Sequence, residues 1–197
     1  MGFVKQTGHF FFVWRDKLPV PLVLGMAGCA RPRLVNWLLG LPLIVVGESL
    51  RIWALMHIGP KTRTREISAE RLITSGPYSH CRNPLYLANF IKILGFMVVS
   101  GNPLFAAVAA LFYLLEFATM IPYEEGFLAE KFPEAHKCYR EAVPAFIPSL
   151  EANPRFAAEA NFTLAEALQS EKRTFASTSL ILVLVAFAAI FRKERAV

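Results

Sequence analysis

Long apolar stretches, separated by short polar or charged segments, dominate the pattern along the chain. Four of them carry most of the hydrophobicity, at residues 34–58, 84–100, 103–121 and 175–191. Each is about 17 to 25 residues long, which is enough for one helix to cross a hydrocarbon core of about 30 Å. The pattern predicts an all-α, polytopic membrane helix bundle in which residues 1–197 form a single domain.

A fifth apolar run, at residues 18–30, is shorter and contains Pro19 and Pro21. Extending it towards the N-terminus would immerse Arg15, Asp16 and Lys17, and charges are costly inside a bilayer. The charges between the Phe-rich start and this run are also unlike those of a secretory signal. The bundle is therefore expected to have four or five transmembrane helices, depending on whether this run crosses the membrane.

Two of the apolar runs are expected to form a helical hairpin, because only Gly101 and Asn102 separate them. Asn102 is a good N-cap, and Pro103 suits the first helical position. The segments that flank the hairpin, residues 59–83 and 122–174, must then face one compartment. They hold most of the loop cations, so the positive-inside rule places them in the cytoplasm, although the basic tail at 192–195 argues the other way.

Composition supports a membrane protein. Hydrophobic residues make up 55% of the 197 residues and charged residues 18%, and the mean hydropathy is +0.42; these values exclude disorder and disfavour a soluble globule. The formal net charge of +6 comes mostly from cations beside apolar runs, which loop asymmetry explains without nucleic acid. The three cysteines are expected to be free thiols, and no metal site is expected.

Ionisable residues lie inside the expected spans. Glu48 and Arg51 are three residues apart on one helix face, and Lys92 and Glu116 lie in the two helices of the hairpin. Such groups are costly in a bilayer, so each is a candidate functional residue. The structural alternative, which we favour, is that Glu48 pairs with Arg51 and Lys92 pairs with Glu116 to fix helix packing.

The segment LITSGPYSHCRNPLY at residues 72–86 leads from a basic loop into a span. Asn83 as N-cap and Pro84 at the first helical position would start a helix whose N-terminus favours a bound carboxylate or phosphate. Tyr78 and Tyr86 flank this start, and a tyrosine there is ordinarily an interface anchor. The segment is therefore a candidate anion site with a simple structural alternative.

A second polar segment follows the hairpin, where Glu124 and Glu125 open the stretch at residues 123–148. Acids in a first helical turn are ordinarily complements to the helix dipole. The hairpin, however, brings its two cytoplasmic ends together, so Asn83, Tyr86 and Glu124 should surround one pocket. Carboxylates, an amide, aromatic faces and a helix N-terminus suit a zwitterionic nucleoside that carries a sulfonium.

The motifs GPYSHCRNPLY, EEGFLAEKF and Y-x-x-x-VPAFIP, in this order around a hairpin, resemble those of a family of integral-membrane methyltransferases. This family includes isoprenylcysteine carboxyl methyltransferase and the phospholipid methyltransferases, and the resemblance covers about residues 66–148. It implies S-adenosylmethionine as cofactor, bound on the cytoplasmic side under a lid of loops. It also implies a lipophilic acceptor from the bilayer, either an isoprenylcysteine-like carboxylate or a lipid amine.

The resemblance also implies site residues. Our hypothesis for catalysis is that Arg82 and Glu125 orient groups or steady charge, and that Glu125 takes the proton if the acceptor is an amine. The residues that would bind the cofactor are Glu70, Arg71, Leu72, Ile73, Tyr78, Asn83, Pro84, Leu85, Tyr86 and Glu124.

The chain departs from the family pattern at two places. Asn83 stands where the family usually has histidine, and an amide hydrogen-bonds but does not act as an acid or base near neutral pH. Residues 119–122 contain no arginine, and none flanks Val143-Pro144, although the family tends to carry one near each position. A carboxylate acceptor favours an arginine clamp, so methylation of a prenylcysteine carboxylate is the less favoured option.

Two alternatives remain open at the level of sequence. Some membrane sterol and steroid reductases have similar C-terminal segments and bind NADPH, but Glu124 and Glu125 would repel its 2′-phosphate. A lipid-binding or transport bundle could instead use the ionisable residues within the spans, although the chain lacks the repeated halves of many transporters.

Overall fold

The computed structural model describes residues 2–15, 17–59, 71–156 and 158–195, and the side chains of residues 6–190 within those ranges. This part of the chain is helical with connecting loops and contains no strand. Its helices, in order, are α1 (Gly2–Trp14), α2 (Pro19–Cys29), α3 (Leu34–Ile58), η2 (Gly76–Ser79), α4 (Pro84–Ser100), α5 (Pro103–Lys131), α6 (Pro133–Ala142), η3 (Pro154–Phe156), α7 (Leu164–Ser170) and α8 (Lys172–Arg195). The expected all-α helix bundle is confirmed.

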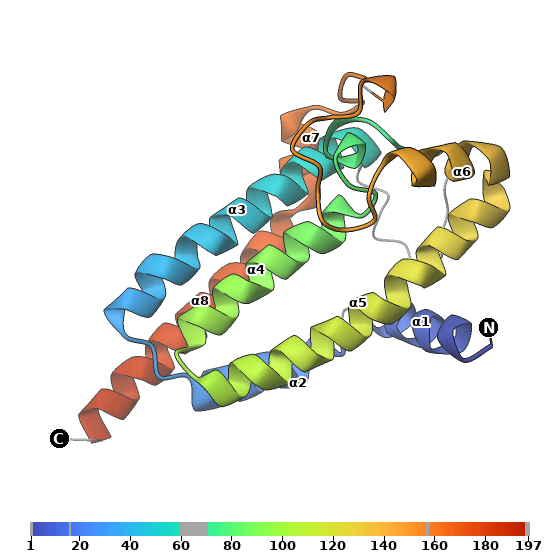
Figure 1. Cartoon of the computed structure of the whole chain (residues 1–197). Helices are drawn as coiled ribbons and strands as arrows, with labels where there is room; N and C mark the ends of the chain where they lie inside the picture. The colour runs from blue at the N-terminus through green and yellow to red at the C-terminus, as the bar shows by residue number, and fades with distance from the viewer. Residues whose placement is uncertain (1, 16, 60–70, 157, 196–197) are drawn as a thin grey trace.

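α3 and α4 form the most extensive helix–helix contact in the described part of the chain and lie side by side along most of their length (Figure 1). Glycines allow this approach. A Cβ added to Gly47 would lie 2.7 Å from the backbone oxygen of Ala88 and 2.8 Å from the backbone nitrogen of Lys92. A Cβ at Gly95 would lie 2.7 Å from the oxygen of Gly40. Small residues at such positions are typical of helices that pack within membranes.

The expected hairpin between α4 and α5 is confirmed. The Asn102 side-chain oxygen accepts hydrogen bonds from the backbone N–H groups of Leu104, at 3.0 Å, and Phe105, at 3.1 Å. Gly101 adopts a φ of 61°, in the left-handed region that glycine tolerates without strain. The turn also contacts the end of α2, because the Asn102 side-chain amide donates to the Cys29 carbonyl at 2.9 Å.

α5 is longer than the expected span. It continues past residue 121 and through Pro122 to Lys131, so the acid pair lies inside this helix and not in the first turn of a new one. α1, which the hydropathy pattern does not predict, supports α5 beside the proline. Gly8 of α1 packs against the Thr119 carbonyl and the Tyr123 side chain, and the His9 ring hydrogen-bonds the Tyr123 hydroxyl at 2.9 Å.

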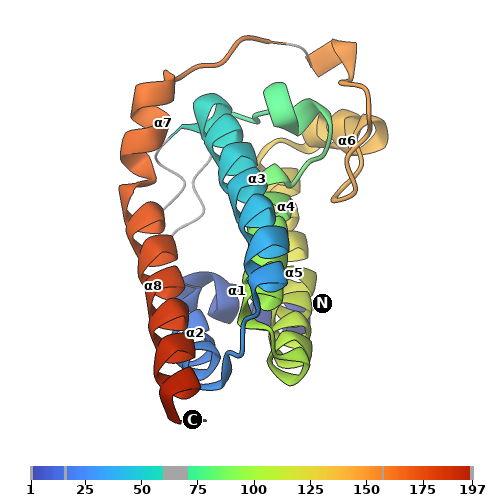
Figure 2. The same cartoon turned by 90° about the vertical axis from the view of Figure 1, so that its left-hand side faces the viewer.

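α7 and α8 form a second layer against the α3 and α4 pair, following each other along one side of the molecule (Figure 2). A capping box formed by Thr163 and Glu166 opens α7. α8 begins at Lys172, slightly before the expected start at residue 175. Among the described helices, α3, α5 and α8 are long and apolar enough to cross a membrane, whereas α2 and α4 are shorter apolar helices.

The distribution of side chains is that of a protein in lipid. Large apolar side chains face outward, as at Leu38 (64% exposed), Val45 (62%) and Leu111 (61%). Several polar or charged residues are buried: Glu48, His57, Ser75, Ser79, Asn83, Ser100, Glu116, His136, Glu171 and Thr178. Outward apolar and inward polar groups indicate that the surrounding solvent is hydrocarbon.

The expected ion pairs within the spans are wrong. Glu48 pairs with Lys92, with Nζ and Oε1 3.2 Å apart, and Arg51 pairs with Glu171, with Nε and Oε2 2.8 Å apart. Glu48 and Arg51 share a face of α3, but Glu48 meets its opposite charge on α4 and Arg51 meets its own at the junction of α7 and α8. Lys92 faces α3 because its backbone packs on Gly47, so it is directed away from Glu116 on α5.

Candidate active site

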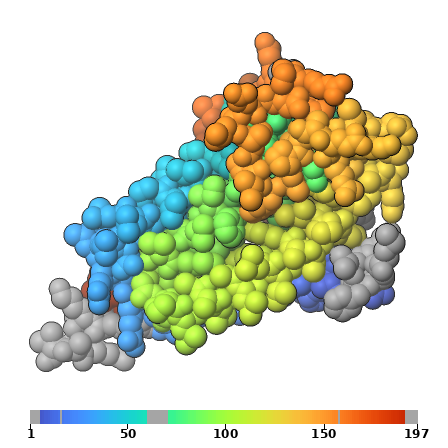
Figure 3. All heavy atoms as spheres, in the orientation of Figure 1, coloured from blue at the N-terminus to red at the C-terminus, as the bar shows by residue number. Residues whose placement is uncertain are grey.

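Residues 71–83, which precede α4, are held by contacts with the end of α3 and with the segment after α6. The His57 ring hydrogen-bonds the Ser75 hydroxyl at 2.9 Å, and the Tyr139 hydroxyl donates to the Tyr78 carbonyl at 2.6 Å. The Arg82 backbone N–H donates to the Pro144 carbonyl at 2.8 Å. In Figure 3 the segment after α6 covers much of this loop. The two predicted motif segments are therefore held together.

Arg82, Asn83 and Glu125 form the centre of this assembly. Both oxygens of Glu125 accept from Arg82, which donates from Nε and Nη2 at 3.0 Å each. The Asn83 amide adds a third bond to Glu125, at 2.9 Å. Arg82 Nη1 also donates to the carbonyls of Val143, at 2.6 Å, and Arg140, at 3.1 Å. A bidentate, partly buried pair of this kind fixes the angle between α5 and the start of α4.

The Asn83 side chain does not cap α4. Asn83 occupies the N-cap position, but its amide donates to Glu125 and, at 3.0 Å, to the Ala145 carbonyl. The capping hydrogen bond expected from the sequence is therefore absent among the described contacts. Both long-range bonds are donated by the side-chain nitrogen of Asn83, and they fix the orientation of its amide, whereas a cap would need the side-chain oxygen to accept from a backbone N–H of α4. The first turn of α4 thus has no side-chain cap.

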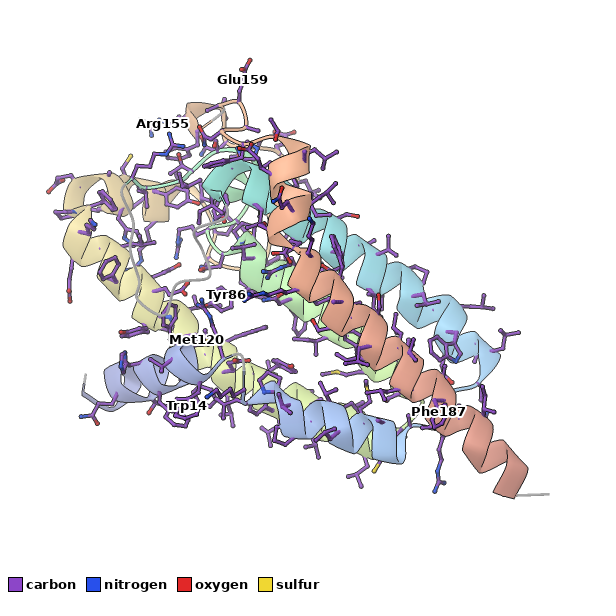
Figure 4. The ribbon with its side chains drawn as sticks, turned by 180° about the vertical axis from the view of Figure 1, so that it is seen from behind. Trp14, Tyr86, Met120, Arg155, Glu159 and Phe187 are labelled. Carbon is purple, nitrogen blue, oxygen red and sulfur yellow. The ribbon has the colours of Figure 1, made fainter. Side chains whose placement is uncertain are left out.

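Tyr78, Tyr86 and Glu124 lie on the inner side of this assembly. Figure 4 shows Tyr86 in the interior between α4 and α5, near Met120. The Tyr86 hydroxyl hydrogen-bonds the Glu124 carboxylate. The Tyr86 ring packs edge-on against Phe117, with the ring centroids 5.4 Å apart. The site therefore combines a carboxylate, a phenol and aromatic walls away from bulk water.

Tyr78 is 6% exposed, and its hydroxyl has no hydrogen-bond partner within the described part of the chain. Burial, together with the nearby Tyr139 and Glu124, raises the pKa of Tyr78 well above its usual range, while Arg51 acts in the opposite direction. The phenol therefore stays protonated and able to donate. A buried hydroxyl without a partner is costly, so this position favours a bound acceptor.

The predicted site residues are placed as follows. Six of the predicted residues are brought together: Tyr78, Arg82, Asn83, Tyr86, Glu124 and Glu125. Pro84 is buried and Leu85 half-buried in the first turn of α4. Arg71 is exposed, Leu72 and Ile73 are half-buried, and no described contact joins these three to the acid pair. Glu70 lies outside the described residues.

Charged residues that the motifs do not predict also approach this region. Arg15, at the end of α1, acts electrostatically on Glu116, Glu124 and Tyr86. Arg51 of α3 acts on Tyr78 from the membrane side. The sequence identifies Arg51 as a charge inside an expected span. It does not identify Arg15, because no pattern in the sequence predicts that α1 folds against α5. In the part of the chain that the structure describes, no group of three His, Cys, Asp or Glu residues could hold a metal ion.

Comparison with known proteins adds independent information. The family model for phospholipid methyltransferases matches residues 35–135, just over half of the chain. A cobalt-zinc-cadmium resistance protein of Cupriavidus metallidurans is 37% identical over 73% of this chain and 66% of its own length. A nickel-cobalt-cadmium resistance protein of Alcaligenes xylosoxydans is 32% identical over 73% of this chain and 67% of its own length.

Protein-S-isoprenylcysteine O-methyltransferase B of Arabidopsis thaliana is 33% identical over 55% of this chain and 57% of its own length. The chain thus spans about two thirds of the length of the two resistance proteins and little more than half of the plant enzyme. No solved structure matches the chain significantly. From its motifs, its helix arrangement and these similarities, the chain belongs to the phospholipid methyltransferase family of membrane enzymes.

Proposed function

We propose that the protein transfers a methyl group from S-adenosylmethionine to a lipophilic acceptor at the cytoplasmic surface of the membrane. One observation carries this proposal. The buried Tyr78 hydroxyl, which has no described partner, lies with Glu124 and Tyr86 inside an assembly built by the family motifs. Family membership supports methyl transfer, and the chemistry of these side chains supports the cofactor.

The residues present fit the cofactor. Glu124 can accept from ribose hydroxyls or from an ammonium group, and Tyr78 can donate to a carboxylate. The faces of Tyr86 and Phe117 offer the electron-rich surface that attracts a sulfonium. We propose the same role in cofactor binding for the Arg71, Leu72 and Ile73 segment, as the resemblance implies.

When bound, the cofactor supplies an activated methyl group, and the protein supplies orientation and a site without bulk water. Glu124, Tyr78 and Tyr86 would bind and orient. Arg82, Asn83 and Glu125 hold the start of α4 against α5, and so they keep Tyr86 beside Glu124. Arg82 and Glu125 therefore act first as positioning residues, and the role of Glu125 as proton acceptor stays a prediction.

The acceptor is proposed to be a lipid amine or an isoprenylcysteine-like carboxylate that enters from the bilayer. The only enzyme activity named among the relatives described above is that of the isoprenylcysteine methyltransferase. The names of the two bacterial relatives refer to metal resistance.

Calorimetric titration of the detergent-purified protein with S-adenosylhomocysteine, with NADPH in parallel, tests the proposal. We expect saturable binding of S-adenosylhomocysteine, lost in Glu124→Gln and kept in Glu141→Gln, which changes an exposed carboxylate of α6. Binding of NADPH alone would assign the chain to a reductase activity. Equal affinity of wild type and Glu124→Gln would remove Glu124 from the site.

A further inference from the structure

A buried polar network lies on the membrane side of the candidate active site, and the chemistry proposed above does not use it. Arg51 of α3 is its centre. Its Nε and Nη2 donate to the two oxygens of Glu171, at 2.8 and 3.2 Å, and its Nη1 donates to Asn89 of α4 at 2.9 Å. Glu171 is fully buried between α7 and α8. The guanidinium is thus fixed from two sides.

This network adjoins the site. Asn89 lies three residues after Tyr86, on the same face of α4. The end of α3 that follows Arg51 packs on the loop that carries Tyr78, since the Trp53 and His80 ring centroids are 5.9 Å apart. Arg51 is also among the charges that act on the Tyr78 hydroxyl. Arg51 of α3 therefore lies at the membrane side of the site, while Glu124 of α5 lies at another side.

The groups around Arg51 differ in chemistry from the carboxylate of Glu124. A guanidinium carries five N–H groups, and the three contacts above occupy only part of them. The protonated Tyr78 hydroxyl is a second donor and has no described acceptor. Arg82, by contrast, is engaged with Glu125 and two carbonyls. A fixed cation beside a buried phenol is a recognition element for a carboxylate.

We propose that Arg51, held by Glu171 and Asn89, binds together with the Tyr78 hydroxyl the carboxylate of the amino-acid part of the cofactor. This assignment rests on the proposed function. It places the anionic end of the zwitterion at Arg51 and its cationic or hydroxyl groups at Glu124. Glu171 is then a positioning residue, and the junction of α7 and α8, outside the family-model match, completes the site.

Two ligands separate this role from a merely structural one. S-adenosylhomocysteine carries the carboxylate, whereas 5′-methylthioadenosine keeps the nucleoside and thioether but lacks the amino-acid group. For Arg51→Gln we expect the affinity for S-adenosylhomocysteine to fall about 10- to 100-fold, the range of a charge-assisted hydrogen bond. The affinity for 5′-methylthioadenosine should stay within about threefold of wild type. Glu171→Gln should show the same selective loss to a smaller degree.

Lys92→Met is the matched control, because it removes a buried cation from the Glu48 pair deeper in the same helix contact. It should weaken neither ligand selectively. Should Arg51→Gln not fold, Arg51→Lys and Glu171→Gln give the same comparison. Equal loss of both ligands, or no loss, in these variants would overturn the assignment while leaving the proposed function intact. Wild-type protein that binds neither ligand would overturn the proposed function itself.

Discussion

At the scale of single residues, the adjacent acids of the family motif have separate environments. Glu125 accepts two bonds from Arg82 and one from Asn83, whereas Glu124 faces Tyr86. Successive residues of a helix point about 100° apart, so one acid faces the loop assembly and the other faces the interior. The pair therefore divides into a residue that holds the structure and a residue that is available to a ligand.

Replacing Glu125 should destabilise the fold. Glu125→Ala leaves the Arg82 guanidinium without its carboxylate in a site where the Arg82 side chain is 9% exposed. Removing one partner of a buried pair costs about 3 to 5 kcal/mol. Thermal unfolding in detergent should show a clearly lower midpoint than for wild type or for Glu141→Ala on the exposed side of α6. An unchanged midpoint would show that the Arg82 pair does not hold the loops.

The three thiols should differ in reactivity. Cys81 is buried, and burial raises its pKa to about 11, whereas Cys29 and Cys138 are exposed. Because the thiolate is the reactive form, Cys81 should not react with a maleimide at about pH 7.5, while the other two should. Its labelling should begin only as the pH rises towards 11. Mass spectrometry of the labelled peptides measures this, and full labelling of Cys81 at neutral pH would contradict the described burial.

At the scale of elements, close helix contacts depend on glycine. Gly47→Val places atoms against the backbone of α4 at Ala88 and Lys92, which cannot yield as a flexible side chain would. Overpacking of this kind costs about 1 to 3 kcal/mol or more. Gly25→Val on α2 is a matched control, because a Cβ at Gly25 meets nothing within 4 Å. Equal unfolding midpoints for the two variants would disprove the tight contact between α3 and α4.

Local signals predicted much of the fold. Hydropathy predicted α3 and α4, and the Asn102-Pro103 pair predicted the hairpin, because both depend on neighbouring residues. The hairpin in turn predicts that Asn83, Tyr86 and Glu124 lie close together. The length of α5, the position of α1 and the partners of Arg51 and Lys92 depend on which helix faces which. The sequence pattern of a single helix does not contain that information.

At the scale of the whole molecule, the two ends of the helix bundle differ in the groups they carry. The candidate site, α6 and α7 gather at one end, whereas Cys29 and the α4–α5 turn lie at the other (Figure 1). The excess of loop cations in the sequence segments at the site end supports the proposal that this end faces the cytoplasm. We therefore propose that the cofactor comes from the cytoplasm and the acceptor from the bilayer.

Cysteine labelling also tests this orientation. A membrane-impermeant maleimide added to intact cells should react with Cys29 and spare Cys138 of α6, and permeabilised cells should react at both. Cys81, which is buried, serves as the internal negative in both samples. Labelling of Cys138 in intact cells, with Cys29 protected, would place the site on the opposite side of the membrane.

The activity proposed for this bundle is the transfer of a methyl group from S-adenosylmethionine to a lipophilic acceptor. The most direct test incubates purified protein with methyl-labelled S-adenosylmethionine and membrane lipid extract and then counts the label in the organic phase. We expect time-dependent label in the lipid fraction, absent with Glu124→Gln and inhibited by S-adenosylhomocysteine. No transfer to lipid extract or to an isoprenylcysteine analogue, by protein shown to bind the cofactor, would contradict it.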